Sequence, residues 1–241
     1  MSNNRIAMWS GPRNISTALM YSFNNRIDTI CTDEPLYPNY LLNTGVLHPG
    51  RLEIINNQNL DINETINEIC NGNIDGAKIH YQKHMAHHLL PEMPISWISK
   101  LKNCILIRDP KEVILSLSKK ISNIDINSTG LIEQIRIFEY ILENTGKNVT
   151  IIDSSDILKD PILMLTKLCK ELDIKFDESM LSWKEGPKKC DGIWSKHWYQ
   201  EVWKTTAFKT YKTSKINLSD SNEIIYQECK PLYERLYSFR I

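Results

Sequence analysis

Short apolar runs that alternate with helical segments restrict the fold of this chain more than any other feature. Each run has the length of a buried strand, and the segments between them show helical periodicity or helix-start signals such as Asp109-Pro110 and Asp160-Pro161. Strands separated by helices pair in parallel, with helices covering both faces of the sheet. The pattern therefore predicts an α/β fold of three layers, a parallel β-sheet flanked by helices, formed as one domain over residues 1–241. The predicted strands are residues 6–9, 28–32, 77–82, 103–107 and 148–152.

Composition excludes several classes of partner. The 29 Lys and Arg residues balance the 29 Asp and Glu residues, so no overall field attracts nucleic acid. No apolar run reaches the length of a membrane span, and the N-terminal Met1-Ser2-Asn3-Asn4 lacks a signal-peptide pattern. The six cysteines show no C-x-x-C spacing, which is typical of reduced thiols. We expect a cytoplasmic protein with neither a nucleic-acid nor a membrane partner.

The loop after the first predicted strand has the composition of an anion site. A strand, a tight loop and a helix start follow one another here, and the first N–H groups of a helix attract negative charge. Ser16 and Thr17 add hydroxyl donors and Arg13 adds a guanidinium. In the alternative interpretation, this is an ordinary turn capped by Asn14 or Ser16. The loop reads Gly11-Pro12-Arg13-Asn14-Ile15-Ser16-Thr17, without the lysine of a phosphate-binding loop of the G-x-x-x-x-G-K-[ST] kind.

A second motif begins at the end of the fourth predicted strand. It reads Arg108-Asp109-Pro110-Lys111-Glu112-Val113-Ile114-Leu115-Ser116. Because parallel strands end at the same edge of the sheet, Arg108 is expected near the anion loop. Alternatively, Arg108 pairs with Asp109 or another acid, and Ser116 is an ordinary serine in the middle of a helix.

The segment 183–208 differs from the rest of the chain. Trp183, Trp194, Trp198 and Trp203 lie here among glycines and lysines, with weak periodicity. The tryptophans either pack against the edge of the sheet or form a lid over an aromatic, anionic ligand.

Together these segments resemble the sulfotransferase family, which uses 3′-phosphoadenosine 5′-phosphosulfate (PAPS). The match is closest to a divergent bacterial branch with a W-S-G-P-R-N-x-S-T loop, and it covers roughly residues 5–205. The family's P-[KR]-[SG]-G-[ST]-T loop corresponds to residues 12–17, and its R-[ND]-P-x-[DE]-x-x-x-S motif to residues 108–116. Its K-G-x-x-G-x-W loop is similar to residues 185–194, which are longer. The resemblance implies a sulfotransferase of P-loop NTPase-like fold.

The resemblance also implies roles for individual residues. Arg13 would stabilise charge on the leaving oxygen, residues 11–17 would hold the 5′-phosphosulfate, and Arg108 with Ser116 would hold the 3′-phosphate of PAPS or of its product PAP. Ile15 stands where the family has a glycine, Ala18 where many members have an aromatic residue, and Glu185 where the family prefers a base. The closing loop would then contribute four residues, namely Lys188, Lys189, Gly192 and Trp194.

Two residues are candidates for the general base. His84 follows the third predicted strand, and the segment is similar to the K-x-H segment of animal cytosolic members. Glu34 follows the second strand and is similar to the acidic base of a carbohydrate-acting branch. We rank His84 slightly ahead, because an imidazole needs no tuning near neutral pH. His84 and His88 have i, i+4 spacing without the pattern H-E-x-x-H, so no metal is expected.

The expected reaction moves a sulfuryl group from PAPS to a hydroxyl or amine of a small-molecule or carbohydrate acceptor, which the sequence does not identify. Two other classes stay open. One is a P-loop-type small-molecule or nucleoside kinase with Asp33 or Asp109 as a magnesium ligand. The other is a non-catalytic nucleotide-binding protein that kept the fold. A homodimer is also left open.

Overall fold

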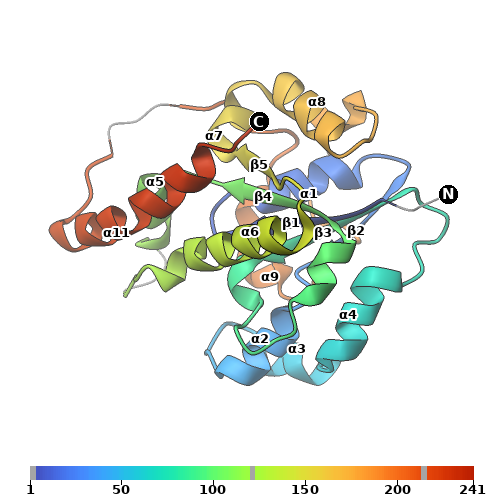
Figure 1. The fold of residues 1–241 in the computed structure, drawn as a ribbon, viewed down its shortest axis with the longest axis horizontal. Coiled ribbons are helices and arrows are strands. Elements are labelled where there is room, and N and C mark those ends of the chain that lie inside the picture. Colours follow the sequence, from blue (N-terminus) through green and yellow to red (C-terminus); the bar gives the residue numbers. More distant parts are fainter. Residues whose placement is uncertain (1–3, 120–122, 213–215) are drawn as a thin grey trace.

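The computed structural model describes residues 4–119, 123–212 and 216–241, and it contains a five-stranded parallel sheet (Figure 1). The strand order is β2-β3-β1-β4-β5, with every neighbouring pair parallel. Each predicted run forms one strand, so the predicted α/β class is confirmed. The strands are β1 (Asn4–Ser10), β2 (Thr29–Asp33), β3 (Ile79–Met85), β4 (Lys102–Ile107) and β5 (Thr150–Asp153).

Helices cover both faces of the sheet. In β1, Ile6 and Met8 contribute to the core under α1 (Ser16–Asn24) and α8 (Pro161–Glu171), while Ala7 and Trp9 contribute to the core on the other face. Figure 1 shows α8 on one side of the sheet and α4 and α6 on the other. β1 is therefore buried on both sides, as a central parallel strand should be. The second face carries α4 (Ile62–Asn71), α6 (Leu131–Thr145) and α11 (Asp220–Tyr237).

Shorter elements surround these layers. Asp109 and Asp160 accept hydrogen bonds from the first turns of their helices, which confirms both predicted helix starts. The sequence did not predict α2 and α3. It predicts a helix from Lys111 to about Lys120, and the end of that helix lies outside the described residues. The remaining helices are α2 (Tyr37–Thr44), α3 (Arg51–Asn57), α5 (Pro110–Leu117), α7 (Ser154–Lys159), α9 (Ser195–Trp198) and α10 (Gln200–Trp203). The 3₁₀ turns are η1 (Ala86–His88), η2 (Ser96–Lys100), η3 (Asn127–Thr129) and η4 (Glu178–Leu181).

The chain leaves β1 and β4 in opposite directions. From β1 it passes through α1 to β2, beyond β3, whereas β4 leads to β5 at the other edge of the sheet. Open parallel sheets bind ligands at such a switch point, outside the carboxyl ends of the strands. Ser10, Asp33 and Ile107 are the last residues of β1, β2 and β4, so the predicted site residues share this edge.

β3 continues three residues beyond the predicted end at residue 82. Lys83 and His84 therefore lie inside a strand, where successive side chains point to opposite faces. Both side chains are almost completely buried. The strand therefore directs the side chains of Lys83 and His84 to opposite faces of the sheet.

The candidate anion site at the switch point

The loop between β1 and α1 has an unusual backbone. Arg13 and Ile15 have φ angles of 64° and 57°, in the left-handed region. For a β-branched residue this is a rare conformation that costs about 1–3 kcal/mol. A glycine would adopt this conformation without strain, and this chain has Ile15 instead.

Gly11 packs the same loop against the start of α6. A Cβ at Gly11 would lie 2.2 Å from the carbonyl oxygen of Thr129, and a Cβ at Gly130 would lie 3.2 Å from Cα of Gly11. The backbone of the loop at Gly11 therefore packs directly against the backbone at Thr129 and Gly130, with no side chain between them.

We expect Gly11→Ala to destabilise the protein by about 1–3 kcal/mol, the usual cost of overpacking. The new methyl group meets backbone atoms of Thr129, which cannot turn away as a side chain can. Thermal unfolding measures the loss. Gly146→Ala is the control for adding a methyl group to a glycine where there is room for it, because a Cβ at Gly146 would meet nothing within 4 Å. Its φ of 61° adds some backbone strain to the control. Equal melting temperatures for wild type and Gly11→Ala would contradict this packing.

Buried polar side chains fasten the loop to β4. Asn14 Nδ2 donates to the carbonyl oxygen of Leu106 (3.0 Å), and Ser154 Oγ donates to the carbonyl oxygens of Asn14 (3.0 Å) and Ile107 (2.8 Å). Asn14 is thus an anchor for the loop, not a helix cap. The residue before α1 is Ile15, which forms no side-chain cap, so the first N–H groups of α1 are available to an anion.

Two guanidinium groups meet beside this loop. Arg13 Nε donates to Ser116 Oγ (2.8 Å), and Arg108 donates to the backbone carbonyl oxygen of Arg13. Arg108 also pairs with Glu112 through Nε and Nη2, both at 2.7 Å. The structure therefore brings Arg13, Arg108 and Ser116 together, and Arg108 pairs with Glu112 instead of the neighbouring Asp109, which caps α5.

This cluster has surplus positive charge. Glu112 faces Arg108, but Arg13 has no carboxylate partner within the described part of the chain. Burial, and next the charge of Arg108, lower the pKa of Arg13. An anion between the two guanidinium groups would relieve their repulsion.

The buried acid cluster

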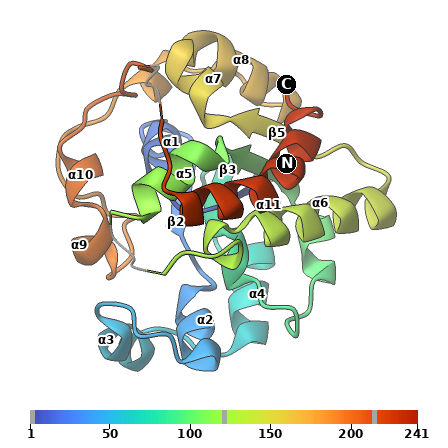
Figure 2. The ribbon, with the colours of Figure 1, turned by 90° about the vertical axis from the view of Figure 1, so that its left-hand side faces the viewer.

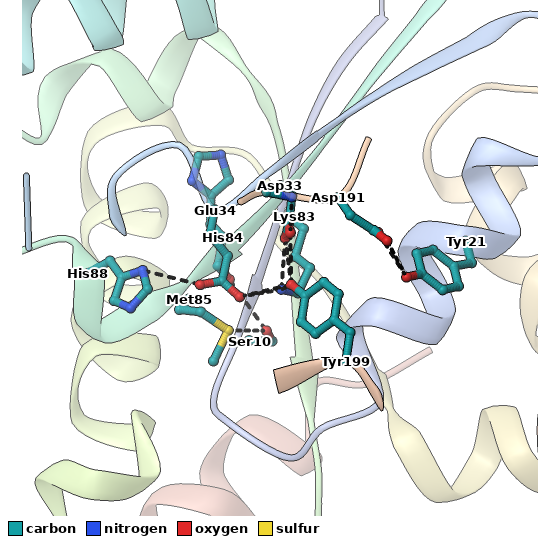
Figure 3. Close-up of polar contacts among 11 residues, drawn as sticks. Ser10, Tyr21, Asp33, Glu34, Lys83, His84, Met85, His88, Asp191 and Tyr199 are labelled. Atoms are coloured by element: carbon teal, nitrogen blue, oxygen red, sulfur yellow. Dashed lines mark hydrogen bonds and ion pairs between the residues drawn. The ribbon is translucent and has the colours of Figure 1, made fainter. Parts of the chain in front are cut away.

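A second cluster lies at the ends of β2 and β3 (Figure 3). Lys83 Nζ donates to Asp33 Oδ1 (2.9 Å), to Glu34 Oε1 and to the hydroxyl oxygen of Tyr199 (2.6 Å). The Tyr199 hydroxyl donates to Asp33, with both carboxylate oxygens at 2.8 Å. The backbone N–H of Gly192 completes the shell of Asp33 by donating to Oδ2 (3.1 Å). One ammonium thus neutralises two carboxylates. The sequence predicted Glu34 as a candidate base and Asp33 only as a magnesium ligand in the kinase alternative.

Burial determines the protonation behaviour of the cluster. It raises the pKa of Glu34, and the charge of Asp33 adds to the effect, although Lys83 opposes it. For Lys83, the two carboxylates outweigh burial and raise its pKa, so the lysine stays charged. The Thr17 side chain lies close enough to the Tyr199 hydroxyl to lower its pKa against the raising effect of burial, so this cluster adjoins the anion loop. Glu34 is therefore a carboxylate of raised pKa beside the loop.

His84 lies on the other face of β3. Its ring stacks on Trp9 (centroids 4.4 Å apart), and Nε2 lies 3.3 Å from Gln82 Oε1. Burial, and next the charges of His80 and Lys83, lower the pKa of His84 to about 3. A group of such low pKa is a weak base, and the ring is fully buried away from Lys83 and Tyr199. The geometry therefore favours Glu34 over His84, contrary to the ranking made from sequence.

The segment 183–208 closes over the acid cluster. Trp194 is buried against Tyr37 of α2, and a Cβ at Gly192 would lie 2.1 Å from the Trp194 ring. Lys188 lies 4.7 Å above the ring of Tyr21 in α1, while Lys189 is exposed. Lys188 is therefore beside α1, whereas Gly192 and Trp194 lie toward β2. Figure 2 shows α9 and α10 of this segment along one side of the molecule.

The four tryptophans have different environments. Trp183 and Trp194 are buried, Trp203 is partly buried and donates to Asp191 Oδ2 (2.9 Å), and Trp198 is 43% exposed. Asp191 also accepts a hydrogen bond from the Tyr21 hydroxyl (2.8 Å). Packing is thus the main role of these rings, and the same packing places Tyr199 over Asp33.

Three general properties complete the description. All six cysteines are free thiols. In the residues that the structure describes, no group of three or more His, Cys, Asp or Glu side chains is arranged to hold a metal ion. Within the same residues, no helix has both the length and the apolar character needed to cross a membrane.

Comparisons with known proteins agree with this geometry. The family described as "Sulfotransferase domain" matches residues 4–238. Two Arabidopsis thaliana proteins, named branched-chain-amino-acid aminotransferase-like proteins 1 and 2, are each 34% identical to the chain over 97% and 96% of its length. The chain spans only 41% of each of these relatives.

Solved sulfotransferase structures share the fold. The sulfotransferase domain of the curacin biosynthetic pathway superposes with a TM-score of 0.57 at 13% identity, covering 98% of both chains. A sulfotransferase from Alicyclobacillus acidocaldarius gives 0.54 at 11% identity, covering 99% of this chain and 96% of the other. The predicted family is confirmed by the match over residues 4–238, and the chain belongs to the sulfotransferase family.

Proposed function

We propose that this protein transfers a sulfuryl group from PAPS to a hydroxyl or amine of a small-molecule or carbohydrate acceptor. The observation that carries the proposal is the pair of guanidinium groups, Arg13 and Arg108, beside an uncapped helix start at the switch point of the sheet. A nucleotide with phosphate groups at both its 5′ and 3′ positions would neutralise this surplus charge.

The residues present fit such a nucleotide. Arg108 and Ser116 would hold the 3′-phosphate, and the start of α1, with Ser16 and Thr17, would hold the 5′ end. Ser116 contacts Arg13, so the two halves of the site are already connected through side chains. When bound, PAPS would supply the sulfuryl group.

Two residues of the chain would carry the chemistry. Arg13 would stabilise the negative charge that develops on the leaving oxygen, as in other transfers dominated by electrostatics. Glu34 would accept the proton of the acceptor, because its pKa is raised and it adjoins Thr17 through Tyr199. We place the base at Glu34 because His84 is stacked inside the opposite face of the sheet.

Calorimetric titration with PAP in metal-free buffer tests the proposal. We expect binding by the wild type and a loss of about 10- to 150-fold in Arg108→Ala, since one charge-assisted hydrogen bond contributes about 1.5–3 kcal/mol. Arg235→Ala is the matched control, because Arg235 pairs with Glu139 on the exposed surface. A wild type that binds ATP with magnesium but not PAP would refute the proposal and favour a kinase.

A further inference from the structure

The two oxygens of the Glu34 carboxylate have different surroundings. Oε1 accepts a hydrogen bond from Lys83 and lies 3.3 Å from the Tyr199 hydroxyl oxygen, whose single proton is donated to Asp33. Oε2 points the other way, toward His88 in η1, as Figure 3 shows. With Oε1 occupied, Oε2 is the oxygen that can take a proton from a substrate.

His88 presents a nitrogen to Oε2 without bonding to it. Nδ1 lies 3.8 Å from Oε2, beyond hydrogen-bond distance. The atom is buried and has no hydrogen-bond partner among the described residues, in a side chain that is only 3% exposed. Buried polar atoms without partners are uncommon, and this one faces the reactive oxygen.

The ring of His88 is held in place. It stacks on Tyr37 (centroids 4.7 Å apart) and on Tyr40 (4.6 Å), both from α2, and His87 packs edge-on at 4.5 Å. Burial, and next the charges of His87 and Lys83, lower the pKa of His88, which keeps the imidazole neutral. Next to an ionised carboxylate, the tautomer with hydrogen on Nδ1 has the lower energy.

The distance between these two groups is compatible with one bridging oxygen atom. Nδ1 and Oε2 are 3.8 Å apart, so one hydroxyl oxygen can lie about 2.8 Å from each of them, at hydrogen-bond distance from both. It would accept the Nδ1 hydrogen bond and donate its own proton to Oε2. It still has a second lone pair for attack on sulfur, whereas an amine nitrogen has only one lone pair.

We propose that His88 Nδ1 and Glu34 Oε2 together hold the acceptor, and that the acceptor is a hydroxyl compound. The inference rests on the proposed function. As the new bond between the acceptor oxygen and sulfur forms, the bond from sulfur to the bridging oxygen of PAPS breaks. The acceptor proton moves to Glu34, and PAP leaves with the electron pair of the broken bond.

The kinetic test measures PAP release from PAPS, with water as the acceptor and with added 2-naphthol. His88→Phe keeps a ring for stacking but removes both nitrogens, and we expect a fall of about 10- to 100-fold with PAP affinity unchanged. His88→Asn restores a donor near the position of Nδ1 and should recover at least about tenfold of that loss. His48→Phe makes a ring exchange on the other side of Tyr37, without contact to Glu34. It also removes the 2.8 Å hydrogen bond between His48 Nδ1 and the Tyr37 hydroxyl, and it should still stay within about twofold of wild type. Wild-type rates in His88→Phe would overturn the inference.

A crystal structure of the free protein gives a second, independent test. We expect an ordered water oxygen within hydrogen-bond distance of both His88 Nδ1 and Glu34 Oε2. A direct hydrogen bond between these two atoms, with no oxygen between them, would overturn the inference. Because this readout needs neither PAPS nor turnover, failure of the wild type to bind PAP would refute the proposed function and leave the test of His88 intact.

Discussion

Replacing Lys83 with methionine is expected to lower the free energy of unfolding by about 3–5 kcal/mol, the usual cost of removing one partner of a buried ion pair. The ammonium is 1% exposed and is the cation between Asp33 and Glu34. Without it, two buried carboxylates repel each other, and both must be protonated or hydrated. At about 2–4 °C per kcal/mol for a chain of this size, thermal unfolding would show the loss clearly.

Two further variants make this prediction specific. Lys83→Met/Glu34→Gln removes one of the two unpaired charges and should regain part of the lost stability. Lys196→Met breaks the exposed pair with Glu53 and should leave the melting temperature unchanged, since surface pairs contribute little. A melting temperature of Lys83→Met equal to that of wild type would show that the carboxylates do not depend on this lysine.

Replacing Glu34 with glutamine should lower the rate of sulfuryl transfer by about 10²- to 10⁴-fold, the usual contribution of a general base. Glutamine keeps an oxygen that can accept from Lys83, so the fold and PAP affinity should persist. The pH profile provides a second readout. Glu34 must be ionised to accept a proton, and burial raises its pKa above the ordinary value of 4.5. The wild-type rate should therefore fall as the pH drops through this raised pKa.

The same profile separates the two candidate bases. In Glu34→Gln, the remaining activity should not show that acid limb. A normal rate in Glu34→Gln, with a large loss in His84→Asn, would return the base to His84 despite its stacking on Trp9.

The layers of the fold were predictable because they depend on local patterns. Each strand contains a short run with the length and composition of a strand, and the predicted helix starts at Asp109 and Asp160 carry aspartate caps. Helix α2 was missed because Pro38, Asn39 and Asn43 have low helix propensity. In the structure Pro38 lies in the first turn, where a proline is tolerated, and the packing of Tyr37 and Leu41 supplies the remaining stabilisation.

The site could be predicted only where it follows a motif. Arg13, Arg108 and Ser116 lie in two spaced patterns, and the sheet brings them together. The end of β3 was misjudged because Lys83 appears too polar for a buried strand. Only the carboxylates of Asp33 and Glu34 make its burial tolerable.

Tyr199 could not have been found from sequence. It lies 166 positions from Asp33, in a segment without periodicity, and its role exists only through tertiary contacts. His88 drew notice in the sequence only for its i, i+4 spacing from His84, and no local signal shows that its Nδ1 faces Glu34.

The long separation of Tyr199 from Asp33 has a consequence for folding during synthesis. The sheet is complete once β5 has left the ribosome at Asp153, but Tyr199 and Gly192 emerge about 40 residues later. Contacts so distant in sequence form late, because the chain must first close a large loop. On the nascent chain, Lys83 faces Asp33 and Glu34 without the tyrosine that completes their hydrogen bonds. The centre of the site is therefore completed only after all five strands of the sheet have been synthesised.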